Sequence, residues 1–231
     1  MGEEPSGRWP FPIFAVGWLA LVSVVMMLKN GAVGILPLDF QYAVGFTPSE
    51  FFAHPWVVLR TPVALLFNND AVQFSYVAAI FMLAVPAFEV RHGWRRTVFV
   101  FVVGGLGSVF AVTIFVLGPL YLLFPGNAVV SHSFLRPYMG DSTAVFAVAG
   151  ALAATLPSAR ARWAILLGAL TWETGVFWLF YHFGELNSFF HYAALASGFF
   201  LARSRLFARI PSPESAPAPA PRLEEAEGES A

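Results

Sequence analysis

The chain has 231 residues, of which 58% are hydrophobic and only 12% are charged. Soluble domains carry about 25% charged residues, so this composition excludes an ordinary soluble domain and predicts an all-α membrane protein surrounded by the lipid bilayer. The absence of cysteine excludes disulfides, thiolate chemistry and a cysteine-bound metal. No nucleotide-binding glycine motif is visible, and we expect no cofactor, no metal and no nucleic-acid partner.

Six apolar stretches predict membrane-spanning helices, because about 20 helical residues cross a bilayer. In chain order they are Phe11–Leu28, Ala71–Val90, Thr97–Phe124, Ser142–Leu156, Trp163–Phe183 and Asn187–Ala202. The fourth stretch is short, because Pro157 ends it after 15 residues. We therefore expect its N-terminus to lie below the outer surface, at the floor of a water-filled cavity.

The basic residues predict the orientation of these six spans. If the N-terminus is inside, ten of the 13 Lys and Arg residues lie on the cytoplasmic side, as the positive-inside rule requires. The ten are Arg8, Arg91, Arg95, Arg96, Arg160, Arg162, Arg203, Arg205, Arg209 and Arg222. The sequence thus predicts a multi-pass protein of a prokaryotic cell membrane with both termini in the cytoplasm, and leaves its oligomeric state open.

The segments outside the spans divide the chain into three parts. Residues 1–10 are predicted to be a cytoplasmic segment and residues 204–231 a disordered cytoplasmic tail, and they flank a membrane domain at residues 11–203. The composition from Pro211 onward alternates Pro, Ala, Ser and Glu, which predicts a disordered tail. The long loop at residues 29–70 combines aromatic side chains with prolines, so we expect it to lie on the membrane surface.

Ser142 begins the fourth stretch, in the sequence Gly140-Asp141-Ser142-Thr143. A helix N-terminus presents N–H groups that suit a developing oxyanion, which makes a nucleophilic serine one interpretation. Asp, Ser and Thr are also favoured helix N-caps, and this motif taken alone favours capping.

His191 lies about one turn into the sixth stretch, on the same side and at a similar predicted depth as Ser142. An imidazole can take a proton from serine and return it to a leaving amine, whereas an interfacial histidine would only reach the headgroups. Small residues at Ala194 and Gly198 predict a close approach to the fourth helix, with His191 on the contact face. The pair predicts a nucleophilic hydrolase, with the two side chains about 2.6–3.2 Å apart.

Glu173 is an ionisable residue near the middle of the fifth stretch. Carboxylates inside membrane spans are often functional, so proton-coupled transport is a weaker hypothesis. A protonated Glu173 that bonds a neighbouring helix is the structural alternative. Because the sequence aims no acid at His191, it predicts a Ser–His dyad and not a triad.

The chain from about Arg60 to Phe200 resembles the rhomboid family of intramembrane serine proteases. Four motifs carry the resemblance. Gly140-Asp141-Ser142-Thr143 is similar to the family's Gly-x-Ser-Gly, and the segment 191–198, which begins with His191 and ends with Gly198, is similar to His-x-x-Gly-x-x-x-Gly. Leu59-Arg60 is similar to Trp-Arg, and Glu89-Val90-Arg91-His92-Gly93 is similar to Glu-x-Arg-x-Gly. The resemblance implies a six-transmembrane-helix bundle that cleaves transmembrane protein substrates near the outer face. It also implies a Ser142–His191 catalytic dyad with Phe146 packed against the histidine, and structural roles for Arg60, Glu89, Arg91, Gly93 and Gly198.

The chain departs from the family pattern around the oxyanion. Gln73 and Val77 stand where the second helix usually carries a histidine and an asparagine, and Asn68 replaces an earlier loop histidine. Thr143 replaces the glycine after the serine. The resemblance assigns oxyanion support to Gln73, Asn68 and Gly140. A rhomboid-like protein that binds membrane helices without cleaving them is the alternative.

Overall fold

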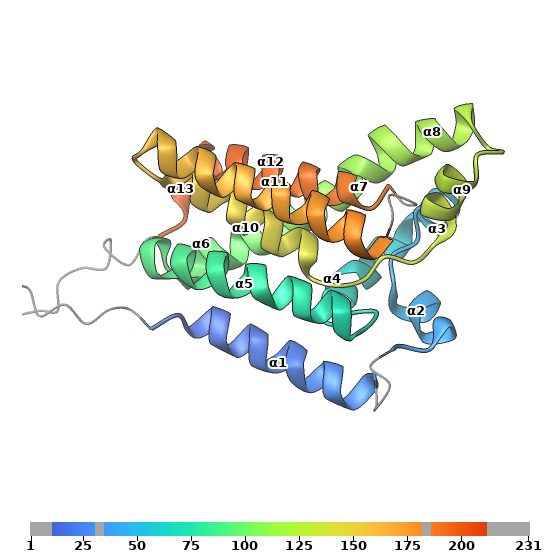
Figure 1. The fold of residues 1–231 in the computed structure, drawn as a ribbon, viewed down its shortest axis with the longest axis horizontal. Coiled ribbons are helices and arrows are strands. Elements are labelled where there is room, and N and C mark those ends of the chain that lie inside the picture. Colours follow the sequence, from blue (N-terminus) through green and yellow to red (C-terminus); the bar gives the residue numbers. More distant parts are fainter. Residues whose placement is uncertain (1–10, 31–34, 182–185, 212–231) are drawn as a thin grey trace, which may run out of the picture.

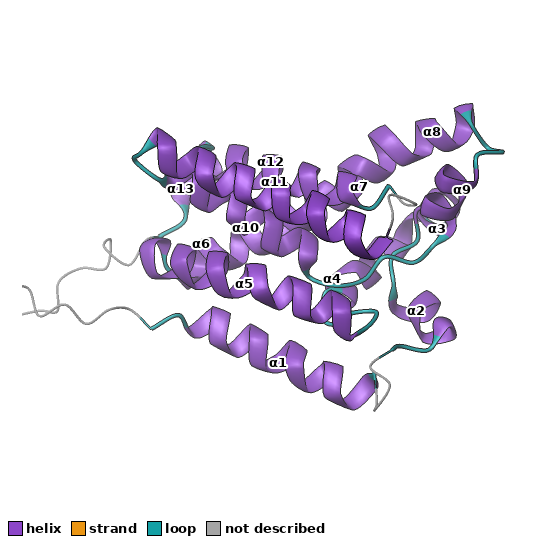
Figure 2. Cartoon of the chain, viewed as in Figure 1, coloured by secondary structure: helices purple, strands orange, loops and turns teal. Residues whose placement is uncertain are grey.

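The computed structural model describes residues 11–30, 35–181 and 186–211, and within these ranges the regular structure is helical. Figure 2 shows helices and loops there and no strand. Extended pairing among the described residues is limited to two isolated bridges, Ile35 with Asp70 and Phe46 with Tyr138. The predicted all-α fold is confirmed. The expected segments at residues 1–10 and 212–231 lie outside the described residues.

Six long helical segments coincide with the six predicted apolar stretches. They are α1 (Ile13–Lys29), α5 (Ala71–His92), a continuous run from Trp94 to Leu123, α10 (Ser142–Thr155), α11 (Ala159–Tyr181) and α12 (Ser188–Ala202). The run comprises α6 (Trp94–Phe99), the π-helical turn η2 (Val100–Gly104), α7 (Gly105–Val112), the π-helical turn η3 (Thr113–Leu117) and α8 (Gly118–Leu123). Two of the segments, Ala71–His92 and Trp94–Leu123, are long and apolar enough to cross a membrane, whereas α1, α10 and α12 are shorter apolar helices.

Short helices fill the connections and gather at one end of the bundle (Figure 1). They are α2 (Leu38–Val44), α3 (Pro48–Ala53), the 3₁₀-helix η1 (Pro55–Arg60), α4 (Thr61–Ala64) and α9 (Ala128–Leu135). Arg60 pairs with Glu50 at 3.0 Å and its guanidinium lies 5.0 Å from the ring centre of Trp56, so it braces the long first loop. The structural role implied for Arg60 agrees with these contacts.

The centre of the bundle is α10 (Figure 1). Every residue from Ser142 to Ala154 is buried, and the helix packs against α5, α7, α11 and α12. Isolated helices of 14 residues are marginal, so α10 depends on these neighbours for its stability. Its side chains are mainly alanine and valine, and small side chains allow neighbouring backbones to approach closely.

Glycines make the tightest contacts between α10 and α12. A Cβ added to Gly198 of α12 would overlap the carbonyl oxygen of Ala147, and one added to Gly150 of α10 would overlap the carbonyl oxygen of Leu195. Each backbone therefore occupies the space that a side chain would take on the other. The predicted close approach at Gly198 is confirmed.

Glu89 joins the end of α5 to the start of α1. Its two carboxylate oxygens accept the backbone N–H groups of Phe14 and Ala15, each at 2.8 Å. Helix N-termini leave such groups without intrahelical partners and favour negative charge, so Glu89 caps α1. Gly93 then turns the chain with a φ of 81°, while Arg91 is exposed. The contacts of Glu89 and the turn at Gly93 agree with the structural roles implied for them.

The folded part of the chain extends further than predicted. The segment expected to be a disordered tail from residue 204 begins with α13 (Arg205–Arg209), which buries Phe207. Its ring lies 6.1 Å from that of Phe88, and Arg96 donates to the carbonyl oxygen of Ile210 at 3.0 Å. The predicted boundary is therefore too early, because the aromatic side chain of Phe207 anchors this short helix against α5.

We expect Gly198→Ala to lower the melting temperature of the detergent-solubilised protein, because the added methyl group would force α12 away from α10. Overpacking of this kind costs about 1–3 kcal/mol. Gly168→Ala on α11 is the matched control, because nothing lies within 4 Å of a Cβ at that position. Equal melting temperatures for the two variants would contradict the close contact.

We expect Glu89→Ala to reduce the amount of folded protein in membranes, because two N–H groups at the start of α1, one buried and one partly buried, would lose their acceptors. Each unsatisfied buried group costs about 1–3 kcal/mol. The measurement is folded yield together with activity per folded molecule. A variant of normal abundance with no activity would show that Glu89 belongs to the site and not to the scaffold.

Candidate active site

Ser142 begins α10 directly after a glycine turn. Gly140 has a φ of 101°, a backbone conformation that side chains with a Cβ rarely adopt, and its N–H donates to the carbonyl oxygen of Ala64 at 3.0 Å. Glycine is also required for space, because a Cβ there would lie 2.7 Å from Nε2 of Gln73. The turn places the serine hydroxyl beside the first N–H groups of a helix, which have no partners within it.

His191 faces Ser142 from the first turn of α12. Its Nε2 lies 2.8 Å from Oγ of Ser142, and both residues are buried. The ring of Phe146 stacks on the imidazole, with the ring centres 4.8 Å apart and the planes 16° apart. The expected hydrogen-bond contact and the expected packing are both present.

Glu173 of α11 lies on the other side of the imidazole. Its Oε1 is 2.7 Å from Nδ1 of His191, an ion-pair distance, although the ring N–H does not align with the oxygen as in a regular hydrogen bond. The hydroxyl of Ser188 donates to Oε1 at 2.7 Å, and the hydroxyl of Tyr76 donates to Oε2. The prediction that no acid reaches His191 was wrong.

The register of α11 and α12 explains this error. α11 continues eight residues past Glu173 to Tyr181, whereas only three residues of α12 precede His191. α11 therefore overshoots the start of α12 by about 7.5 Å, at 1.5 Å per residue. Counting residues inward from the end of each helix therefore suggests that Glu173 lies deeper in the membrane than His191, although the two side chains are level. One feature of the sequence could have indicated this contact: Glu173 is the one acidic residue near the middle of any predicted span.

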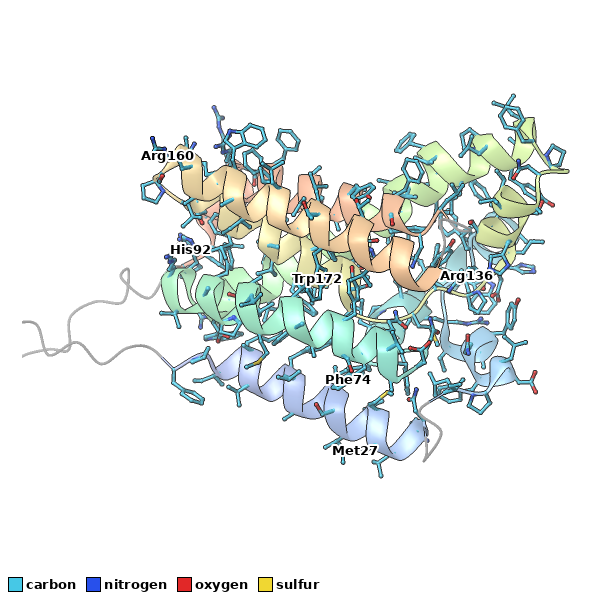
Figure 3. The ribbon with its side chains drawn as sticks, in the orientation of Figure 1. Met27, Phe74, His92, Arg136, Arg160 and Trp172 are labelled. Atoms are coloured by element: carbon cyan, nitrogen blue, oxygen red, sulfur yellow. The ribbon has the colours of Figure 1, made fainter. Side chains whose placement is uncertain are left out.

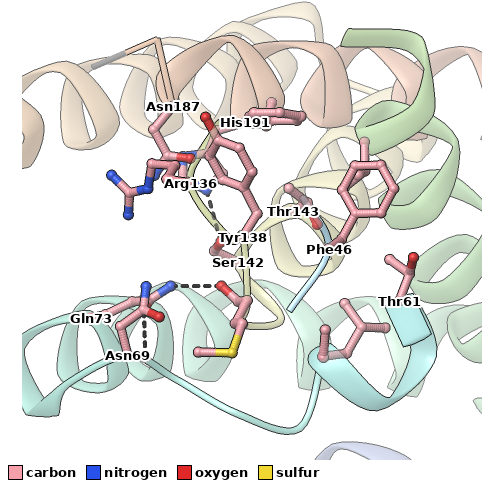
Figure 4. Close-up of a pocket in the computed structure, with 16 residues that line it drawn as sticks. Phe46, Thr61, Asn69, Gln73, Arg136, Tyr138, Ser142, Thr143, Asn187 and His191 are labelled. Atoms are coloured by element: carbon pink, nitrogen blue, oxygen red, sulfur yellow. Dashed lines mark hydrogen bonds between the residues drawn. The ribbon is translucent and has the colours of Figure 1, made fainter. Parts of the chain in front are cut away.

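The oxyanion side of the site differs from expectation. The side-chain amide of Gln73 accepts the N–H of Asn69 at 2.7 Å and donates to the carbonyl oxygen of Met139 at 3.0 Å (Figure 4). Gln73 thus holds the loop that leads into Ser142. Asn68 is buried against Gly140, and Val77 is buried in the apolar core. These contacts suit a scaffold role for Gln73.

A narrow cavity opens above Ser142 (Figure 4). It holds about 40 Å³, room for a few water molecules. Its wall includes five residues singled out from the sequence, Ser142, His191, Gln73, Gly140 and Thr143. The other lining residues were not predicted; they come from loops and helix ends and include Phe46, Thr61, Asn69, Arg136, Tyr138 and Asn187.

No group of three or more His, Cys, Asp or Glu side chains among the described residues is arranged to hold a metal ion. No family model, curated protein or solved structure matches the chain.

We expect Gln73→Ala to lower the free energy of unfolding by about 1–3 kcal/mol, because the Met139 carbonyl and the Asn69 N–H would lose their partner. Ser75→Ala on the same helix is the control, since its hydroxyl bonds only to the carbonyl oxygen of Ala71 in its own helix at 2.8 Å. Unfolding and turnover are measured on one preparation. A stable Gln73→Ala protein with turnover about 100-fold slower would instead make Gln73 an oxyanion donor.

Proposed function

We propose that the protein is an intramembrane serine protease of rhomboid-like architecture, with Ser142 as nucleophile and His191 as general base. The observation that carries this proposal is the 2.8 Å contact between Oγ and Nε2, buried at the N-terminus of a helix inside an apolar bundle. Buried polar pairs in such surroundings are costly unless they have a use. A hydroxyl, an imidazole and free helix N–H groups are the parts that acyl transfer needs.

The reaction follows from these parts. Oγ of Ser142 attacks the carbonyl carbon of the scissile peptide while Nε2 of His191 takes the hydroxyl proton. The resulting oxyanion faces the N–H groups that begin α10. The C–N bond then breaks as His191 gives its proton to the leaving amine. Water adds to the acyl ester, His191 takes a proton from the water, and Ser142 leaves with that proton.

The substrate in this proposal is a transmembrane protein cut near the outer face of the membrane. The six helical segments and the resemblance of four motifs to rhomboid proteases support six spans with both termini in the cytoplasm. Arg160 and His92 lie at one end of the bundle and Arg136 lies at the other (Figure 3). The positive-inside rule places the arginine-rich end in the cytoplasm, so the cavity above Ser142 opens outward.

A binding function without cleavage is the second candidate, and the oxyanion side favours it. Thr143 adds bulk beside the serine, and the Gln73 amide is engaged with the Met139 carbonyl. A rhomboid-like bundle with this site would hold membrane helices without cutting them. The two candidates differ in whether Ser142 is reactive.

A serine-directed fluorophosphonate separates the two candidates. We expect it to label the wild-type protein in detergent and to leave Ser142→Ala and His191→Ala unlabelled. Ser108→Ala is the control, because this buried serine bonds only the carbonyl oxygen of Gly105, at 2.7 Å, and we expect normal labelling. Folded wild-type protein that resists labelling would favour the binding function.

A further inference from the structure

We propose that Glu173 is a positioning residue that completes a Ser142–His191–Glu173 triad, with Tyr76 and Ser188 holding its carboxylate. The inference rests on the proposed protease function and goes beyond the dyad that the resemblance implies. It comes from one juxtaposition: three helices bring a carboxylate, an imidazole and a hydroxyl into one line. The two links of that line measure 2.7 Å and 2.8 Å.

The surroundings of Glu173 are built to hold a carboxylate. Its side chain is 2% exposed, and a buried charge is costly unless partners surround it. The hydroxyl of Ser188 and the hydroxyl of Tyr76 each donate to one of its oxygens. Tyr76 is itself held by stacking on Trp172, with ring centres 6.1 Å apart. α5, α11 and α12 therefore fix the carboxylate together.

Proton-coupled transport explains the surroundings of the Glu173 carboxylate less well than the triad does. A proton path needs a further acceptor, but the other buried carboxylates among the described residues are engaged elsewhere: Glu89 binds backbone N–H groups at the opposite end of α5, and Asp141 accepts the indole N–H of Trp18. Among the partners of Glu173, His191 is the one whose side chain can carry a positive charge. The pairing directs its charge toward the imidazole and not along the bundle.

In the triad, Glu173 acts through His191. A carboxylate beside Nδ1 keeps the proton on that nitrogen, which leaves Nε2 free to accept the proton of Ser142. It also stabilises the imidazolium that forms during attack. The carboxylate keeps its own negative charge, and Ser188 and Tyr76 supply hydrogen bonds to it throughout. Phe146 holds the plane of the ring while Glu173 sets its protonation.

The test compares fluorophosphonate labelling rates of wild type, Glu173→Gln and Thr174→Val across pH. The groups that face His191 are Glu173 from α11 and Tyr76 from α5, with Arg136 in the cavity wall. Glu173→Gln should label about 10²- to 10⁴-fold more slowly. The midpoint of the acid limb should also move to lower pH, because a negative charge beside the imidazole is gone.

Thr174→Val is the matched control. It removes the neighbouring link between α11 and α12, a 3.0 Å hydrogen bond to the hydroxyl of Tyr192, and should leave both the rate and the midpoint unchanged. If Glu173→Gln does not fold, Ser188→Ala replaces it, and we expect about tenfold slower labelling from the loss of one donor to the charge.

The outcomes separate the inference from the function on which it rests. Wild-type protein that does not label contradicts the protease. Labelled wild type with an equally fast Glu173→Gln and an unmoved midpoint overturns the triad and leaves the Ser142–His191 dyad standing. A folded Ser188→Ala with wild-type rate and midpoint likewise overturns it.

Discussion

The close contact between α10 and α12 is the constraint on which the site depends. Gly150 and Gly198 let the two backbones touch, and a Cβ at either position would overlap a carbonyl oxygen. This contact fixes the distance between the helix that carries Ser142 and the helix that carries His191. Without this contact, nothing would hold a hydroxyl and an imidazole on separate helices within hydrogen-bond distance of each other. Packing at the middle of the helices therefore sets the distance between the hydroxyl and the imidazole at their ends.

This arrangement requires a short, buried helix, α10, whose N-terminus is held in place by residues of other elements. Gly140 supplies the turn, Ala64 accepts its N–H, and Gln73 holds the preceding carbonyl of Met139. On the far side, the indole N–H of Trp18 in α1 donates to Asp141 at 2.7 Å. The loop before Ser142 is thus bonded to elements from three parts of the chain. The Gln73 amide, to which the resemblance assigns oxyanion support, is bonded here to backbone groups of Asn69 and Met139.

The sequence predicted the helices well because burial in an apolar bundle leaves long hydrophobic stretches that are easy to recognise. It also identified Ser142 and His191, since a shared predicted depth and the spacing to Gly198 are local patterns. Three features escaped it because each depends on how helices are offset or how loops fold. The overshoot of α11 brings Glu173 to the histidine, the Gly140 turn captures Gln73, and Phe207 docks α13 against α5. None of these leaves a periodic signal.

Two buried glutamates have the same residue type and similar burial but different partners. Both oxygens of Glu89 bind backbone N–H groups, which cannot give up their protons, so this carboxylate can only hold α1 in place. Glu173 is bonded by hydroxyl groups and lies beside an imidazole, whose charge changes when a proton arrives. In the proposed triad the carboxylate of Glu173 stabilises positive charge on the imidazole, a role that backbone amides do not offer to Glu89. The difference lies in the partners, because burial and residue type are the same at both ends of the bundle.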